Sequence, residues 1–339
     1  MLAFVTGSTG FIGLNLIDQL TAAGWDVVAL HRQTSDLTYL QRFDVRRVVG
    51  DISDIGAIER AIPERADAVF HTAADLSSWS RNNDRQTRTN VLGTRNVVAA
   101  ALKRGAKKFV HTSTSSVYGF VSTPVDETAP HLGRGSWFNY MHTKTVAEDE
   151  VRKGIERGLD AVILNPTHAI GRYDRHNWSR LIQLAAKGEL PRIPPGSGSF
   201  CHGGEAARAH IAAVTKGHKG ENYLLAGTDA TFQEVVATAG QLLGRRVETR
   251  TVSAPILRMG AAVLNLVSHF TGKEPLITPE GAALVTINET FRSDKATQKL
   301  DYRPVPLREM VKDCCDWLVE EGLLERVLST ENPCSRGGR

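Results

Sequence analysis

The chain has 339 residues, of which 41% are hydrophobic and 23% are charged, and its formal net charge is +4. This composition fits a globular protein with one large domain or two smaller ones, and it argues against a disordered chain. The basic residues are interspersed instead of clustered with aromatic residues, which argues against a nucleic-acid-binding protein.

Residues 2–13, LAFVTGSTGFIG, predict a strand, a glycine-rich turn and the start of a helix. Apolar residues form the strand, and from Phe11 onward apolar residues recur at helical spacing. In this context Gly7 permits the tight turn, Gly10 lets the backbone approach a diphosphate, and Gly13 lets the helix pack close to the strand. The unpaired N–H groups at the start of the helix attract the diphosphate. The stretch therefore predicts a dinucleotide site.

Strands and helices then alternate through the first half of the chain. Further strands are predicted at 26–30, 47–49, 68–71, 108–112 and 161–164, and helices at 55–62, 90–104 and 140–158. Repeated βαβ units of this length predict an α/β fold, a Rossmann-type doubly wound parallel sheet with helices on both faces. Ligands of such sheets bind beyond the carboxyl ends of the strands.

The second half predicts a smaller, mostly helical lobe for the substrate. After loops rich in proline and glycine we expect a strand at 223–226 that returns to the sheet, and a helix at 231–243 that Thr231 and Glu234 begin as a capping box. A strand at 247–252 and helices at 254–270, 279–287 and 307–322 follow. The predicted division is 1–165 with 208–230 for the cofactor domain, 166–207 with 231–328 for the substrate lobe, and 329–339 for a flexible tail.

Cysteine usage and the first residues of the chain predict the cellular compartment of the protein. The four cysteines have no spacing that suits a metal site or a disulfide framework, and the chain begins directly on its first strand, which leaves no room for a signal peptide. We therefore expect a cytoplasmic protein with no metal. Residues 254–270 contain Arg258 and Asn265 and are too short for a membrane span. They predict an amphipathic helix packed on the protein, with a role at a membrane surface or a partner as the alternative.

The end of the second predicted strand indicates the cofactor. It reads Leu30-His31-Arg32 and carries no acidic residue for a ribose 2′-hydroxyl. An Arg at this position accommodates a 2′-phosphate, so the sequence predicts NADP(H), with Arg32 as the phosphate ligand. A solvated Arg32, and NAD as the cofactor, is the alternative. Asp51, after the third strand, is placed to meet the adenine, and the small residues Thr72, Ala73 and Ala74 leave room for the cofactor.

Tyr140 and Lys144 form the candidate acid/base pair. Four residues apart on a predicted helix, they share one face. An ammonium group nearby favours the phenolate, so we expect Lys144 to lower the pKa of Tyr140 and make it an acid/base for carbonyl–alcohol interconversion. Hydroxyl groups at 112–116 end the fifth strand at the same edge of the sheet, where one of them could bond the reacting oxygen.

The motifs occur in one order along nearly the whole chain. They are Thr6-Gly-x-x-Gly-x-x-Gly13, Asp51, His71-Thr-Ala-Ala74, Asn90-Val-x-Gly-Thr94, a Ser/Thr cluster ending in Val117-Tyr118-Gly119, Tyr140-x-x-x-Lys144, Leu164-Asn-Pro-Thr-x-x-x-Gly171 and Ser293-Asp-Lys-Ala296 before Leu300-Asp-Tyr302. This order resembles the extended short-chain dehydrogenase/reductase family, of the NAD-dependent epimerase/dehydratase type. Within it, the sequence looks most similar to the dihydroflavonol-reductase-like and hydroxysteroid-dehydrogenase-like reductases.

The resemblance implies roles for individual residues. Tyr140 exchanges the proton, Lys144 holds the nicotinamide ribose, Thr114 lies beside the substrate oxygen and Asn90 anchors backbone near the site. The implied cofactor contacts are Gly7, Thr9, Gly10, Phe11, Ile12, Gly13, Arg32, Asp51, Ile52, Thr72, Ala73, Ala74, Lys144 and Pro166, and the implied substrate contacts are Asp75, Tyr118 and His168. The helices near 90–104 and 140–158 would form a homodimer interface.

Three functions remain open at this point. The resemblance implies an NADPH-dependent enzyme that reduces a small-molecule ketone or aldehyde, and aromatic residues such as Trp79, Tyr118 and Trp178 hint at an apolar or aromatic substrate. The alternatives are a nucleotide-sugar epimerase or dehydratase with tightly bound NAD, and a non-catalytic NADP sensor. The sequence departs from the family pattern at Gly203-Gly204-Glu205, where bulkier residues and Asp are usual, and at Asp301, where Gly is usual.

Overall fold

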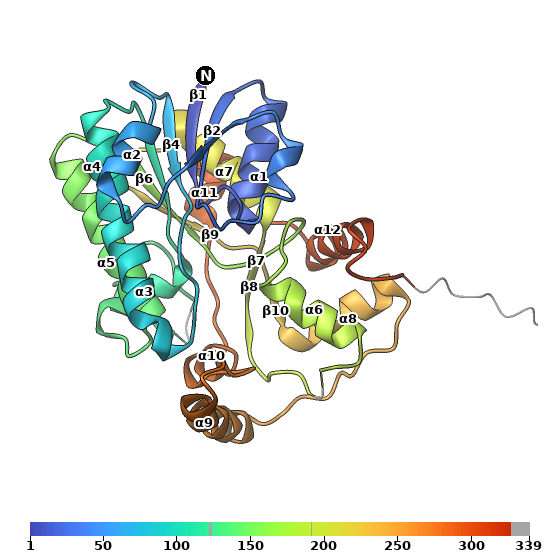
Figure 1. The fold of residues 1–339 in the computed structure, drawn as a ribbon. Helices are drawn as coiled ribbons and strands as arrows, with labels where there is room; N and C mark the ends of the chain where they lie inside the picture. Colours follow the sequence, from blue (N-terminus) through green and yellow to red (C-terminus); the bar gives the residue numbers. More distant parts are fainter. Residues whose placement is uncertain (122–123, 191, 327–339) are drawn as a thin grey trace, which may run out of the picture.

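A computed structural model describes residues 1–121, 124–190 and 192–326. Its main layer is a seven-stranded sheet in the order β3-β2-β1-β4-β5-β6-β9, with every neighbouring pair parallel (Figure 1). The strands are β1 Leu2–Thr6, β2 Asp26–His31, β3 Arg46–Val49, β4 Ala68–His71, β5 Phe109–Thr112, β6 Ala161–Pro166 and β9 Asn222–Leu225. The Rossmann-type sheet is confirmed, as is the late strand that returns to its edge.

Helices cover both faces of this sheet because successive strand residues point to opposite sides. Ala3 and Val5 join the core beneath α1 (Phe11–Ala22), α7 (Gly203–Lys216) and α11 (Asp294–Leu300), whereas Phe4 joins the core beneath α2 (Ile55–Ala61), α4 (Thr94–Lys103) and α5 (Asn139–Glu156). The strand order reverses between β1 and β4, which opens a crevice at the carboxyl ends of these strands.

The helix predicted at 90–104 begins earlier than its sequence indicated. A helical run starts with η2 (Ser80–Asn82) and α3 (Asn83–Thr87), passes through a π-helical turn, η3 (Arg88–Gly93), and continues as α4. A π-helical turn widens the helix and frequently occurs at functional sites. Here it contains Asn90, which the turn brings to the backbone of Asp75.

The second lobe contains a three-stranded sheet in the order β10-β8-β7, formed by β7 (His168–Ile170), β8 (Ser197–His202) and β10 (Thr228–Thr231). The helices α6 (Trp178–Ala186), α8 (Phe232–Leu243) and α12 (Leu307–Glu320) pack around it, and α9 (Ala254–Thr271) and α10 (Pro279–Leu284) lie together at one end (Figure 1). Short 3₁₀ turns occur at η1 (Leu40–Arg42), η4 (Ser115–Tyr118) and η5 (Leu132–Gly135).

Two local predictions for this lobe have opposite outcomes. The capping box of α8 is confirmed, because the Thr231 hydroxyl accepts from the Glu234 N–H while the Glu234 carboxylate accepts from the Thr231 N–H. The strand predicted at 247–252 is wrong. Among the described residues only Thr251 pairs there, as an isolated bridge to Ile193, and none of the strands in this part of the chain lies beside the rest of the segment. The domain boundaries stay a prediction, and the tail at 329–339 lies outside the described residues.

The departures from the family pattern have physical explanations. Gly203 begins α7 against the Phe11 ring, where a Cβ would lie 2.4 Å from a ring carbon, and the Gly204 carbonyl accepts from Gln19. Gly203 thus lets α7 pack tightly on α1, whereas a Cβ on Gly204 would lie 3.0 Å from the His202 ring. Asp301 has φ +52°, the left-handed conformation at a helix end that favours glycine. Its side chain pairs with Lys216.

Helix α9 confirms the helix predicted at 254–270, but most of its apolar face is not packed against the protein as predicted. Only Ala261 and Ser268 are buried in it, Leu257 is half-buried, and its other large apolar side chains are exposed. Among the described residues, no helix combines the length and hydropathy needed to cross a bilayer. Cys201, Cys314 and Cys315 are buried free thiols, and Cys334 lies outside the described residues.

Candidate active site

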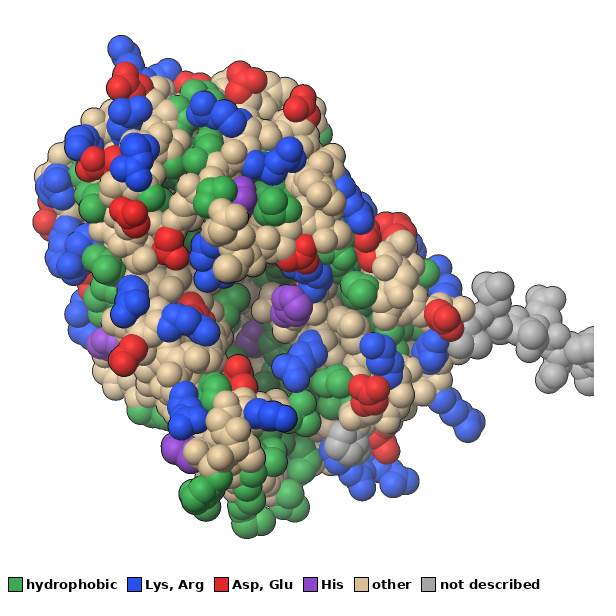
Figure 2. Space-filling model, viewed as in Figure 1, with side chains coloured by type: hydrophobic (Ala, Val, Ile, Leu, Met, Phe, Trp, Pro, Cys, Tyr) green, Lys and Arg blue, Asp and Glu red, His purple; other side chains and the backbone are tan. Residues whose placement is uncertain are grey.

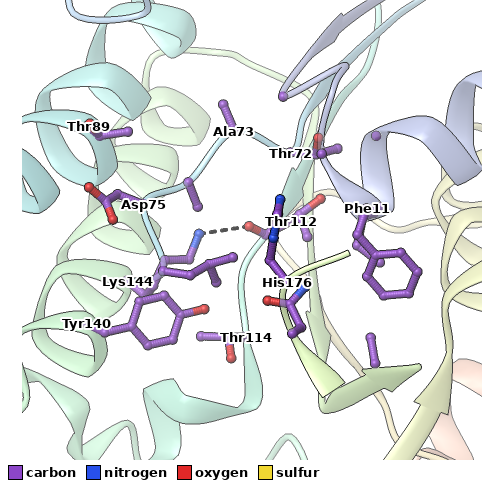
Figure 3. A pocket seen from close by; sticks show the side chains of 18 of the residues that line it. Phe11, Thr72, Ala73, Asp75, Thr89, Thr112, Thr114, Tyr140, Lys144 and His176 are labelled. Atoms are coloured by element: carbon purple, nitrogen blue, oxygen red, sulfur yellow. Dashed lines mark hydrogen bonds between the residues drawn. The ribbon is translucent and has the colours of Figure 1, made fainter. Parts of the chain in front are cut away.

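A cavity of about 900 Å³ lies at the carboxyl ends of the central strands, between the sheet and the second lobe (Figures 2 and 3). The predicted site residues that line it are Gly7, Thr9, Gly10, Phe11, Ile12, Gly13, Arg32, Asp51, Ile52, Thr72, Ala73, Ala74, Asp75, Thr114, Tyr140, Lys144, Pro166 and His168. The fold therefore gathers residues that lie up to 161 positions apart at one crevice. Their individual roles stay predictions.

The glycine turn at one end of the cavity fits a dinucleotide diphosphate. Gly7 has φ +68°, and a Cβ on it would lie 2.6 Å from the Ala73 nitrogen. A Cβ on Gly13 would lie 2.1 Å from the Gly7 carbonyl oxygen. Gly10 precedes α1, and no side chain of the described residues caps that helix, so within this part of the chain the first N–H groups of α1 are free for an anion. The residues present thus fit the diphosphate of a nicotinamide dinucleotide.

The polar residues after β2 and β3 form the next part of the cavity wall. Arg32 is exposed at the rim, its N–H donates to the Ser35 hydroxyl at 3.1 Å, and its guanidinium forms no ion pair among the described residues. The Asp51 carboxylate accepts from the N–H and the hydroxyl of Ser53, both at 2.8 Å. A cation without a partner is thus available where the second phosphate of NADP would need one.

Tyr140, Lys144 and Thr114 meet in the middle of the cavity. Lys144 is buried on α5 and its ammonium donates to the Thr112 carbonyl at 2.9 Å, while the Tyr140 hydroxyl points toward Thr114 (Figure 3). Helix α5 supplies the first two side chains and the turn after β5 supplies the third. A hydroxyl, a phenol and an ammonium group at one point form a suitable proton-transfer site.

The pKa values in this cluster differ from the expectation. Burial raises the pKa of Tyr140 to about 12, and a hydrogen bond from Thr114 acts in the opposite direction without offsetting it. Burial also lowers the pKa of Lys144 to about 8, although the carboxylate of Glu148 favours the ammonium form. The predicted lowering of the Tyr140 pKa by Lys144 is not observed in this structure, because withdrawal of the phenol from water dominates and Lys144 is engaged with Thr112.

Thr114 is held by a buried polar network that the sequence did not indicate. The Asn165 side-chain amide donates to the Thr114 carbonyl at 3.1 Å and to the Glu148 carboxylate at 2.7 Å. Glu148 is only 1% exposed and also accepts from Asn222 at 3.1 Å. Glu148 lies one turn after Lys144 on α5, and its negative charge favours the ammonium form of Lys144. The same carboxylate accepts from Asn165, which also holds the Thr114 carbonyl.

Asn90 fixes the loop after β4 in the same way. Its side-chain oxygen accepts from the Asp75 N–H at 2.8 Å, and its amide donates to the Asp75 carbonyl at 3.0 Å and to Thr143 at 3.1 Å. The Asp75 carboxylate pairs with Arg85 at 2.7 Å. Asp75 lines the cavity, but its charge is already compensated before a substrate arrives.

His168 lies in an aromatic group at the second-lobe end of the cavity. Its ring centroid is 4.7 Å from that of Trp178 and 5.3 Å from that of Phe200. Burial lowers the pKa of His168 to about 4, so the ring is neutral at pH 7. Behind it lies the carboxylate of Glu289, 4.0 Å from the His168 Nε2, and burial raises the pKa of Glu289 to about 8.

Tyr118 is the exception among the predicted site residues. Its side chain is fully buried in a small core with Val125, Leu224 and Phe291 and does not line the cavity. Burial raises the pKa of Tyr118 well above its ordinary value. The 3₁₀ turn η4 directs the ring away from Thr114, so the structure corrects the expected substrate contact.

Several cavity residues carried no motif in the sequence. They come from the segment before and within α6 and from α10, and they are His176, Asn177, Arg180, Gly281, Leu284 and Val285. Trp178, which the sequence suggested only as an aromatic residue, also lines the wall. One signal in the sequence could have found the residues before and within α6. This helix comes shortly after the ends of two strands, where ligands of such sheets bind.

Comparisons with known proteins agree with this geometry. The model of the "NAD dependent epimerase/dehydratase family" matches residues 3–226. "Sterol demethylase protein B" of Methylococcus capsulatus is 30% identical over 96% of this chain and 100% of its own length. A "putative dihydroflavonol 4-reductase" of Synechocystis is 27% identical over 95% and 96%. The solved structure of gox2253 is 30% identical and has a TM-score of 0.82 over 96% of this chain and 99% of its own.

Proposed function

The chain belongs to the NAD-dependent epimerase/dehydratase family, and on this basis we propose that it is an NADP(H)-dependent oxidoreductase that interconverts a ketone or aldehyde with the alcohol. The observation that carries the proposal is the cluster of Thr114, Tyr140 and Lys144 in a cavity that begins at a dinucleotide-type glycine turn. The nicotinamide, when bound, exchanges a hydride with the substrate carbon.

The protein's own groups manage the proton and the oxygen. Tyr140, protonated at pH 7 because its pKa is about 12, donates its proton to the carbonyl oxygen as the carbon receives the hydride, and the product is an alcohol. Thr114 offers a hydroxyl for a hydrogen bond to the same oxygen. Lys144, protonated below its pKa of about 8, would stabilise the phenolate left on Tyr140 only once the phenol has given up its proton, since in the resting cavity its ammonium is engaged with the Thr112 carbonyl.

Replacement of Tyr140 tests the reaction. We expect Tyr140→Phe to lower kcat by roughly 100-fold to 10,000-fold with little change in cofactor affinity, because it removes the general acid and keeps the ring. The substrates are aromatic, aliphatic, steroid-like and sugar carbonyls, with NADPH oxidation as the readout. Tyr39→Phe, a buried tyrosine of the core, is the matched control. Retention of activity by Tyr140→Phe would remove Tyr140 from this role.

Replacement of Arg32 tests the cofactor. A charge-assisted contact with a phosphate contributes about 1.5–3 kcal/mol, so we expect the wild type to prefer NADPH over NADH by roughly tenfold to a hundredfold. Arg32→Asp should reverse the preference, and Arg157→Asp, at the far end of α5, should leave it unchanged. A wild type that prefers NADH would contradict the proposal. Co-purified NAD with no net NADPH consumption would favour an epimerase, and NADP binding without turnover would favour a sensor.

A further inference from the structure

Helix α9 carries a large exposed apolar face. Eight of the sixteen exposed large apolar side chains found in the described part of the chain lie between residues 256 and 276. They are Ile256, Met259, Val263, Leu264, Leu266, Val267, Phe270 and Leu276, and Phe270 is 85% exposed. Single exposed apolar side chains are normal, but a contiguous group of this size marks an interaction surface.

The orientation of α9 makes this surface a ridge. Ala261 and Ser268 form the buried stripe on which the helix packs, so its small residues face the protein. At 3.6 residues per turn, Met259, Val263 and Phe270 project from the opposite side within about 40° of one another. The green side chains at the lower end of Figure 2 show this ridge protruding from the molecule.

Cationic groups border the ridge. The Arg81 guanidinium lies 3.9 Å from the place of a Cβ on Gly272, at the end of α9, and Arg258 donates to the Thr286 hydroxyl at 3.0 Å. Lys273 directly follows the helix. The pKa of the nearby Arg85 guanidinium is raised mainly by its hydrogen bond with Asp75, and the acidic residue of this segment, Glu274, adds a smaller Coulombic contribution. An apolar helix face bordered by Arg and Lys matches the surface of a bilayer that contains anionic lipids.

The ridge is also continuous with the entrance of the cavity. Helix α9 packs against α10, and Gly281, Leu284 and Val285 at α10 line the cavity that holds Tyr140. The hydroxyls of Thr278 and Ser78 hydrogen-bond at 3.0 Å and join this helical pair to the loop after β4. A membrane beneath α9 would therefore lie next to the apolar part of the cavity wall that α10 forms.

We propose that the exposed face of α9 docks the protein on the surface of an anionic lipid bilayer, beside the entrance of the catalytic cavity. Lipid chains conform to a convex ridge, whereas a protein partner needs a complementary groove. One consequence, which rests on the proposed function, is that the substrate is an apolar carbonyl compound dissolved in the bilayer.

Vesicle flotation tests the docking surface with the full chain. The probes are vesicles of pure phosphatidylcholine and vesicles of three parts phosphatidylcholine to one part phosphatidylglycerol. The variant carries Met259→Ser, Val263→Ser and Phe270→Ser, and the matched control carries Ile55→Ser, Leu132→Ser and Leu323→Ser, three exposed apolar side chains elsewhere. Because all six side chains are solvent-exposed, both variants should fold, which circular dichroism and thermal unfolding verify.

The proposal predicts flotation with the anionic vesicles for the wild type and the control, and at least tenfold weaker binding for the α9 variant. Pure phosphatidylcholine should bind less protein, and high salt should weaken binding to the anionic vesicles. Equal flotation of the α9 variant and the wild type would overturn the proposal, as would no flotation of the wild type. A dimer that the α9 variant converts to a monomer in analytical ultracentrifugation would overturn it in favour of a second copy.

Activity separates the docking surface from the proposed reaction. With a water-soluble carbonyl probe, the wild type and the α9 variant should oxidise NADPH at the same rate, whereas with an apolar carbonyl dissolved in anionic vesicles the variant should be slower by at least tenfold. Equal rates in the vesicles would refute the substrate consequence. Flotation without turnover of either probe would refute the proposed reaction and leave the docking surface standing.

Discussion

Glu289 provides the sharpest test of the electrostatics of the second lobe. Its carboxylate is buried, 5% exposed, and its nearest ionisable partner, His168, is neutral at pH 7 because burial lowers the pKa of His168 to about 4. Burial raises the pKa of Glu289 from 4.5 to about 8. We predict that Glu289→Gln stabilises the protein at pH 7, because it removes a group that is protonated when folded and ionised when unfolded.

The size of the effect follows from linkage. For an acid with a raised folded pKa, the unfolded state binds fewer protons, so stability falls as pH rises from the unfolded pKa of 4.5 to the folded pKa of about 8. The slope is about 1.4 kcal/mol per pH unit. The penalty is therefore about 3 kcal/mol at pH 7 and about 1 kcal/mol at pH 5. Any destabilisation caused by poor packing of the new glutamine amide would be the same at pH 5 and at pH 7. It therefore cancels when the effects at the two pH values are subtracted.

Urea unfolding at pH 5, 6, 7 and 8 measures this difference, with far-ultraviolet circular dichroism and tryptophan fluorescence as two independent probes. The free energy of unfolding of Glu289→Gln relative to wild type should become more favourable by about 2 kcal/mol between pH 5 and pH 7. Glu274→Gln, at an exposed position, should stay within about 0.5 kcal/mol throughout. A pH-independent effect of Glu289→Gln would refute the reasoning.

Three further predictions concern the catalytic cavity. Gly13→Ala should weaken cofactor binding at least tenfold and destabilise the protein by about 1–3 kcal/mol, because its Cβ would lie 2.1 Å from the Gly7 carbonyl oxygen. Cofactor titration measures the first effect and thermal unfolding the second. Wild-type values for the variant would contradict the close packing. Glu148→Gln should lower kcat more than it changes KM, because its single amide oxygen can accept from only one of Asn165 and Asn222, which loosens the network that holds Thr114. The exposed Glu156→Gln is the control, and an unchanged kcat would exclude this positioning role. Carbonyl reduction should decline as pH rises above about 8, where Lys144 loses its proton. Alcohol oxidation should instead increase with pH as Tyr140 ionises. Initial rates in both directions from pH 6 to 10 measure this, and parallel pH profiles would contradict the roles given to Tyr140 and Lys144.

The sequence determined the first half of the fold and the cofactor end of the cavity. Gly7 is required by its positive φ and Gly13 by its close packing on Gly7, and Gly10 stands between them at the start of α1, so the spacing of the three indicated the strand, the turn and the helix. The capping box of α8 is equally local, because Thr231 and Glu234 satisfy each other's N–H groups three residues apart. The alternation of strands and helices along the chain then required a parallel sheet, and a parallel sheet brings the carboxyl ends of all its strands to one edge.

Tertiary packing decided what local patterns could not. The ring of Tyr118 follows a reactive hydroxyl in sequence, yet the turn η4 buries it in the core with Phe291. Glu148 reads as an ordinary charged helix residue and becomes the hub of a network only because Asn165 and Asn222 lie on adjacent strands. Helix α9 has an apolar face in the sequence, but whether such a face is buried depends on whether other elements cover it. In this fold α9 packs against α10 and buries only Ala261 and Ser268, so most of its apolar side chains face outward as a ridge next to the helix that lines the cavity.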